Sequence, residues 1–333
     1  MAIIEDRLQE RGWLLADGAT GTNLFDRGLT SGEAPELWNA DRPDEITRLY
    51  RNFTDAGADI ILTNSFGGTS RRLRLHNAHP RVHELNMRAA ALARDVADRA
   101  GRKILVGGSV GPTGDLFAPL GELTETEAVD IFAEQIEGLK AGGADVIWIE
   151  TMSAIEEMRA AADAATLCGM EFIITASFDS AGMTMMGLSP AAMATSTLAF
   201  PTKPHAVGCN CGVGASDLVC SVLAITEAEP AAIVIAKANC GVPRVKGDSV
   251  VYTGTPELMA DYARLARDAG ARIIGGCCGT SPIHLAAMRD ALDRHTTRGR
   301  PDLETVVAAL GPLVSPPSTA VSTRRPNRRY REG

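Results

Sequence analysis

Three cysteines in two Gly-rich segments are the residues of this sequence whose types and spacing most clearly could do chemistry. Cys277 and Cys278 are adjacent within GGCCGT, and Cys211 lies within GCNCG. A regular strand would send neighbouring thiols to opposite faces, but the flanking glycines permit a bulge or a turn that brings both to one side. Three cysteine ligands with an open fourth position describe a catalytic zinc site. The sequence therefore predicts Zn²⁺ bound by Cys211, Cys277 and Cys278.

Zinc on three thiolates is poorly suited to polarising a carbonyl group, because its ligands already donate much negative charge. It suits binding a fourth thiol and presenting it as a nucleophile, so we expect alkyl transfer to sulfur. Holding the other end of a small thiol requires polar groups. Asp17 and Glu150 are placed to accept hydrogen bonds from an ammonium group. Backbone N–H groups of Gly18, Ala19 and Thr20 can cradle a carboxylate, which predicts an amino-acid substrate with a free thiol.

These residues also have structural interpretations. Free cysteines are often small core residues, and Asp17 could make an Asx turn with Gly18. Asn239 could merely satisfy backbone groups in a turn. Glu150 has the stronger functional case, because a carboxylate directly after the apolar run DVIWI is costly to bury without a partner.

Eight short apolar runs alternate with stretches that carry helix signals, and these elements must position the candidate residues. Most of the runs are continuously apolar, as parallel strands covered on both faces are. Helix caps such as Thr124 with Glu127, and Thr255 followed by Pro256, predict helices between them. The pattern predicts an α/β protein with a single (β/α)8 TIM barrel. A doubly wound sheet would carry an early Gly-rich phosphate fingerprint, and we find none. The strands are expected at 13–18, 59–66, 103–111, 145–151, 172–178, 205–211, 232–240 and 272–278.

The active site of such a barrel lies where the carboxyl ends of the strands and the βα loops converge. The candidate residues, Asn239 included, all follow or end predicted strands, so they would share one rim. Strand alternation places Cys209 on the same face as Cys211, and Cys209 is expected to line the barrel interior rather than bind metal. Strand alternation places Lys237 and Asn239 on the same face of the seventh strand, and the sequence does not decide how both side chains are accommodated.

The composition excludes several classes of protein. Of 333 residues, 45% are hydrophobic, which is ample for a core, and a formal charge of −8 argues against nucleic-acid or membrane-surface binding. No apolar run reaches the ~18 residues of a membrane span, and the charged start predicts no signal peptide, so we expect a cytoplasmic protein. Seven cysteines without an export signal favour metal-binding or reactive thiols over disulfides.

Two parts of the chain are expected to differ in order. Residues 1–300 would form the barrel, and residues 301–333 a flexible basic tail, because that segment is rich in Pro, Ser, Thr and Arg and lacks an apolar period. The sequence leaves the oligomeric state open, a homo-oligomer included.

Six segments, DGATGT, LTNSFGGT, GSVGPTGD, WIETMS, GCNCG and GGCCGT, resemble in content and order the zinc-dependent homocysteine S-methyltransferases over about residues 10–295. The resemblance implies a (β/α)8 barrel, zinc on the same three cysteines, and methylation of homocysteine to methionine. It also implies that the two carboxylates bind the homocysteine amino group, that the GATGT backbone binds its carboxylate, and that Asn239 belongs to the site.

Two departures from the family pattern concern the metal and the methyl donor. Cys240 stands where related sequences commonly have alanine, which adds a spare thiol near the proposed metal. Phe66 is the only aromatic residue in SFGGTSRRLRLHN, where animal betaine-dependent members carry an aromatic-rich stretch, and a trimethylammonium cage uses aromatic faces. The sequence resembles more closely bacterial betaine–homocysteine methyltransferases and the homocysteine module of corrinoid-dependent methionine synthase. The expected donor is therefore betaine or a methyl-corrinoid supplied by a partner protein.

Two competing functions remain at the level of the sequence. A phosphate-binding barrel isomerase or aldolase would cradle phosphate after the seventh and eighth strands, where GVP and GGCCGT lie. A non-catalytic zinc- or thiol-binding subunit of a methyltransferase complex would bind metal without turning over homocysteine.

Overall fold

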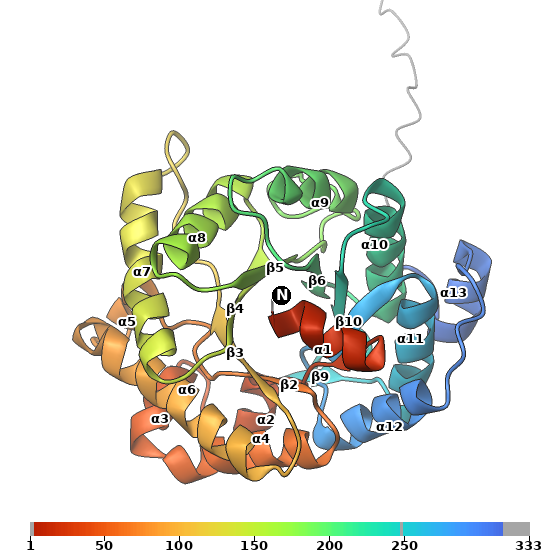
Figure 1. The fold of residues 1–333 in the computed structure, drawn as a ribbon, viewed down its shortest axis with the longest axis horizontal. Coiled ribbons are helices and arrows are strands. Elements are labelled where there is room, and N and C mark those ends of the chain that lie inside the picture. Colours follow the sequence, from red (N-terminus) through yellow and green to blue (C-terminus); the bar gives the residue numbers. More distant parts are fainter. Residues whose placement is uncertain (1–2, 247–248, 316–333) are drawn as a thin grey trace, which may run out of the picture.

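Eight parallel strands close into a barrel in the computed structural model, which describes residues 3–246 and 249–315 (Figure 1). Their order in the sheet is β1-β10-β7-β6-β5-β4-β3-β2, and a parallel bridge between Ala16 and Ile60 joins the first strand to the last. The predicted (β/α)8 architecture is confirmed. The strands are β1 (Leu14–Leu15), β2 (Ile60–Leu62), β3 (Leu105–Val110), β4 (Val146–Met152), β5 (Phe172–Ala176), β6 (Val207–Cys211), β7 (Val234–Ala238) and β10 (Ala271–Gly276).

Helices surround the barrel, and several begin at the predicted caps. The Thr124 side chain accepts from the Glu127 N–H while Glu127 accepts from the Thr124 N–H, which is a complete capping box. The helices are α1 (Ile3–Arg11), α2 (Gly21–Phe25), α3 (Trp38–Asp41), α4 (Pro43–Asp55), α5 (Ser70–Arg74), α6 (Val82–Arg99), α7 (Glu125–Ala141), α8 (Ile155–Leu167), α9 (Pro190–Leu198), α10 (Ala215–Ala228), α11 (Pro256–Asp268), α12 (Pro282–Asp293) and α13 (Leu303–Leu310).

Helix α1 closes one end of the barrel. Ile4 and Leu8 pack with strand residues of the interior, and α1 crosses the centre of the ring in Figure 1. The Ile3 N–H donates to Glu171, which precedes β5, and Arg7 donates to the carbonyl of Lys103, which precedes β3. Because these contacts lie at the amino ends of the strands, the closed end is opposite the rim where the candidate residues gather.

A short antiparallel hairpin between β7 and α11 was not predicted. It consists of β8 (Pro243–Lys246) and β9 (Ser249–Tyr252). Its base is held against the loop after β10, because the Cys240 N–H donates to the Cys278 carbonyl at 2.8 Å and the Gly254 N–H donates to the Cys240 carbonyl at 3.0 Å. The strands are too short to stand out from a loop in the sequence.

The predicted flexible tail, residues 301–333, is wrong at its start. Leu303–Leu310 forms α13, which contacts α10 and α11 and buries Val306 and Leu310. Apolar residues spaced four apart at these positions provide the packing face that the prediction overlooked. The chain is then held at Asp217, whose carboxylate accepts from the backbone N–H groups of Val314 and Ser315. Residues 316–333 lie outside the described part of the chain.

Removing residues 301–333 is expected to lower the free energy of unfolding by about 2–4 kcal/mol, because burial of Val306 and Leu310 is lost. Removing only residues 316–333 should leave it unchanged within error. Urea unfolding of the two truncated proteins and the full chain checks this. Equal midpoints for all three would show that α13 contributes no stability.

No helix in the described residues combines the length and apolarity that a membrane crossing requires.

Candidate metal centre and substrate site

Three sulfur atoms meet at the carboxyl-end rim of the barrel. The Sγ atoms of Cys211, Cys277 and Cys278 all lie within 4.8 Å of one another. Sulfurs bound tetrahedrally to one zinc ion through bonds of about 2.3 Å stand about 3.8 Å apart. The cluster therefore fits a zinc ion with small adjustments, and its soft thiol donors are those that zinc favours. The convergence of these three cysteines, expected from the sequence, is found.

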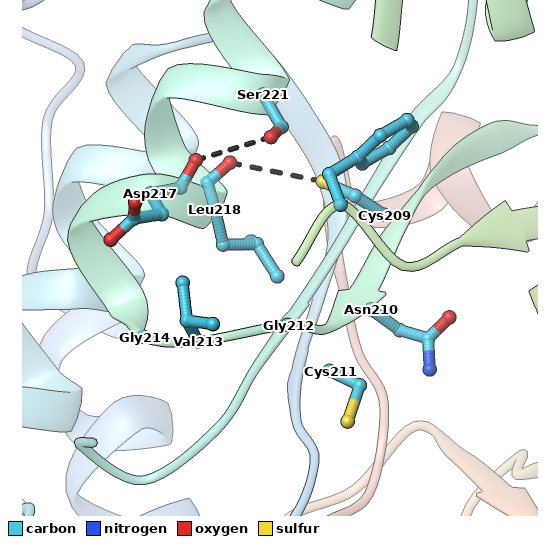
Figure 2. A pocket seen from close by; sticks show the side chains of 10 residues that line it. Cys209, Asn210, Cys211, Gly212, Val213, Gly214, Asp217, Leu218 and Ser221 are labelled. Atoms are coloured by element: carbon cyan, nitrogen blue, oxygen red, sulfur yellow. Dashed lines mark hydrogen bonds between the residues drawn. The ribbon is translucent and has the colours of Figure 1, made fainter. Parts of the chain in front are cut away.

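Cys211 reaches the cluster because its backbone departs from the strand. Along β6, Val207 and Cys209 pack in the layer between barrel and helices, and the Cys209 Sγ lies 3.8 Å from the Leu218 carbonyl of α10 (Figure 2). Regular alternation would also direct Cys211 outward. Its φ of +62° instead turns the thiol away from α10. A left-handed conformation at a residue with a Cβ costs about 1–2 kcal/mol. The prediction that Cys209 lines the barrel interior is wrong.

Cys277 and Cys278 lie in a turn that follows β10. The Cys277 N–H donates to the Ala238 carbonyl at 2.7 Å, and the Thr280 N–H closes the turn on the Cys277 carbonyl at 3.0 Å. Gly279 has a φ of +78°, and a Cβ there would come within 2.3 Å of the Tyr252 ring. The predicted non-strand conformation around the paired cysteines is thus present, with the strand ending at Gly276.

The three neighbouring thiols shift one another's pKa, and the contact with Cys277 lowers the pKa of Cys211 whereas the contact with Cys278 raises it. Burial and repulsion between neighbouring thiolates raise it further, to about 12 overall. The same combination raises the pKa of Cys278 to about 12, although the Tyr252 hydroxyl, within hydrogen-bonding reach of the Cys278 thiol, acts in the lowering direction. Three thiolates at one point therefore need a cation to compensate their charge.

Two asparagines lie close to sulfur atoms of the cluster. Asn239 donates to the Gly212 carbonyl at 2.6 Å and lies 3.6 Å from the Cys211 Sγ, and its buried Oδ1 has no hydrogen-bond partner among the described residues. Asn210 was missed by the sequence analysis. It exchanges hydrogen bonds with Thr151 and lies 3.9 Å from the Cys277 Sγ. Within GCNCG, strand alternation places Asn210 on the face opposite to Cys209, and this signal could have identified it.

Asp17 is already paired with a lysine. Its Oδ1 lies 2.8 Å from the Lys237 Nζ, and its Oδ2 accepts from the Leu62 N–H at 2.7 Å. Both side chains are at most 3% exposed. Lys237 lies within β7 and pairs with Asp17 in the barrel interior, whereas Asn239 follows the strand and lies against Cys211, so the two side chains occupy different places. The sequence analysis did not foresee the pair.

Glu150 offers a freer carboxylate. It continues the interior alternation of Val146 and Trp148 along β4, and the Ser109 hydroxyl donates to its Oε1. No hydrogen bond to its Oε2 is found within the described residues. Burial raises the pKa of Glu150, and the positive charge of Lys237 acts against that rise.

The GATGT turn is held against the loop after β10. The Ala19 N–H donates to the Thr280 carbonyl at 3.0 Å, so it is not free to hold a substrate carboxylate. The N–H groups of Gly18 and Thr20 have no acceptor in the described part of the chain. A Cβ at Gly18 would lie 2.6 Å from the Thr280 carbonyl oxygen, so this close approach requires glycine.

The fold and the site define a (β/α)8 barrel with a cluster of three thiols, able to hold a metal ion, at its carboxyl-end rim. The family model for homocysteine S-methyltransferase matches residues 14–292. This chain belongs to the homocysteine S-methyltransferase family.

Two curated relatives are methionine synthases. The Mycobacterium tuberculosis protein is 29% identical over 295 residues, which cover 84% of this chain and 24% of that protein. The Mycobacterium leprae protein is 26% identical over 341 residues, covering 94% of this chain and 28% of the relative. The chain thus spans about a quarter of the length of these relatives.

A solved structure with the same fold is the homocysteine methyltransferase MmuM from Escherichia coli. Its metallated form has a TM-score of 0.72 and 23% identity, and the match covers 86% of this chain and 99% of that one. The apo form of the same protein has a TM-score of 0.65. At this identity the likeness shows the fold.

Proposed function

We propose that this protein transfers a methyl group to the thiol of L-homocysteine and so forms L-methionine. The convergence of three cysteine sulfurs at the rim of a barrel of this family is the observation that carries the proposal. Zn²⁺ held by Cys211, Cys277 and Cys278 would supply a Lewis acid that lowers the pKa of a thiol bound in the fourth position. No carboxylate or imidazole is required as a general base beyond this.

The residues around the cluster are assigned to the amino-acid end of homocysteine. Glu150 accepts hydrogen bonds from the ammonium group through its Oε2, while Ser109 holds its Oε1. The N–H groups of Gly18 and Thr20 bind the carboxylate, and Ala19 fixes that turn to Thr280. Asn239 keeps the Cys211 loop in register, and its unpartnered Oδ1 is a further acceptor for the substrate.

We assign Asp17 a contribution that differs from the sequence-based expectation. Its carboxylate is occupied by Lys237 and by the Leu62 N–H, so it acts on the substrate through the charge of that pair rather than by direct contact. Glu150 remains the carboxylate for direct contact with the ammonium group.

We infer betaine or a methyl-corrinoid carried by a partner protein as the methyl donor. Phe66 is the one aromatic residue of the segment after β2, and its ring lies against Gly111, where a Cβ would come within 2.5 Å. A single ring already packed on the backbone makes a weak cage for trimethylammonium. This arrangement favours the corrinoid protein over betaine.

A donor panel tests the proposal. Anaerobically purified protein should contain about one zinc per chain. It should form methionine from homocysteine with one donor among glycine betaine, dimethylglycine, S-methylmethionine, methyltetrahydrofolate and methylcobalamin. Methionine is measured by mass spectrometry.

Two outcomes would contradict the proposal. Protein that binds no zinc, and whose thermal stability rises instead with a sugar phosphate, would support the isomerase or aldolase alternative. Full zinc binding without turnover of homocysteine with any donor would support the non-catalytic subunit.

A further inference from the structure

The buried pair of Lys237 and Asp17 lies beneath the proposed substrate site, where Asp17 acts only through its charge. The two side chains meet at 2.8 Å in the barrel interior. The Lys237 Nζ also lies 5.2 Å from the centre of the Trp148 ring, whose Nε1 donates to the Thr175 hydroxyl at 3.2 Å. A carboxylate that follows β1 and an aromatic ring of β4 therefore hold this lysine of β7.

The charges in this part of the barrel do not balance. Asp17 and Glu150 are two buried carboxylates, and the buried Lys237 interacts electrostatically with both and, more weakly, with the Cys277 thiol of the proposed metal site. The two carboxylates and the lysine together carry one net negative charge when all three are ionised. Burying an uncompensated charge is costly, so a ligand that brings one positive charge is strongly favoured over an isosteric ligand without it.

We propose that Lys237 is a specificity-determining residue, because it neutralises Asp17 and leaves Glu150 as the single carboxylate that demands an α-ammonium group from the thiol substrate. This inference rests on the proposed function, since it concerns the same homocysteine site. Lys237 does not touch the substrate and acts through the charge that remains on Glu150.

Two variants distinguish this role of Lys237 from direct contact between Asp17 and the substrate. Asp17→Asn removes a charge while keeping the shape of the side chain, and it frees Lys237 to neutralise Glu150. The site is then neutral and no longer demands an ammonium group. Adding Lys237→Met removes that cation, so Glu150 again stands alone and the demand returns. If Asp17 instead contacted the substrate directly, the second substitution would restore nothing.

The measurement is thiol binding to Co²⁺-substituted protein, which is monitored through the change in sulfur-to-cobalt absorption. It needs no methyl donor. The probes are L-homocysteine and 4-sulfanylbutanoate, which lacks the amino group. The unmodified protein should prefer homocysteine by at least about a hundredfold. Asp17→Asn should reduce the preference to less than about tenfold, and Asp17→Asn with Lys237→Met should restore most of it.

Each alternative outcome is decisive. A preference lost in Asp17→Asn and not restored in the double variant would overturn the role of Lys237 and assign direct contact to Asp17. A preference unchanged in both would show that the pair is structural only. Unmodified Co²⁺ protein that binds neither thiol would instead overturn the proposed function itself. Circular dichroism and melting temperature of each variant verify that it is folded.

Discussion

A Cys278→Ala variant is expected to lose bound zinc and at least about a thousandfold of its methyl-transfer rate. One of three mutually close sulfurs would be missing, and the remaining two thiols cannot complete a site that keeps its fourth position for substrate. The fold should persist, because Cys278 contributes to the loop through its backbone carbonyl, which accepts from Cys240 in any variant. Zinc per chain by atomic absorption and methionine formation are the two measurements.

Cys209→Ala is the matched control for that experiment. Cys209 lies two residues from a proposed ligand in the same strand, yet its thiol is directed at α10. The substitution should keep zinc and activity and cost only the small free energy of a lost buried sulfur. If Cys278→Ala retained a full zinc complement, or if Cys209→Ala lost it, the assignment of the ligands would be wrong.

The sequence was sufficient for the barrel because its strands are buried on both faces. Runs such as DVIWIET have no polar face to confuse with a helix, and β4 indeed extends from Val146 to Met152. The sulfur cluster was also predictable, because strand ends meet at one rim in this architecture. The predictions of the barrel and of the sulfur cluster thus both depended on where residues lie along the strands.

The directions and partners of individual polar groups could not be predicted from the sequence in the same way. Strand alternation placed Cys209 and Cys211 on one face, and a single left-handed residue at Cys211 separates them. The pairing of Asp17 with Lys237 joins residues 220 positions apart in the sequence, and no local pattern marks it. The Ala19 N–H was likewise expected to be free, and it is used by the loop after β10.

Glu150 illustrates how structure sharpened a prediction from sequence. From the sequence, both Asp17 and Glu150 were expected to accept hydrogen bonds from the ammonium group of the substrate. The hydrogen bonds now distinguish them, because Asp17 has its oxygens engaged and Glu150 has one oxygen held by Ser109 and the other without a partner in the described residues. Direct recognition of the amino group should therefore depend chiefly on Glu150.

Glu150→Gln is expected to lower kcat/KM for homocysteine by about a hundredfold or more, mainly through KM. The amide keeps the shape and can still interact with Ser109, but the charge that attracts the ammonium group is lost, and removing one member of a buried charge pair costs about 2–5 kcal/mol of binding. Steady-state kinetics with homocysteine varied at saturating donor provide the measurement. Zinc content should stay at the level of the unmodified protein, because no ligand is changed.

The control is Glu157→Gln, a change of the same size at another buried carboxylate. Glu157 accepts from the backbone N–H and the hydroxyl of Thr113 and is not part of the proposed ammonium site. It should lower stability without raising KM for homocysteine. If the two variants raised KM equally, the effect would reflect general loosening of the barrel, and Glu150 would lose its role. A large effect confined to Glu150→Gln would place the amino end of the substrate beside β4, across the barrel rim from the three cysteine sulfurs near which its thiol would bind.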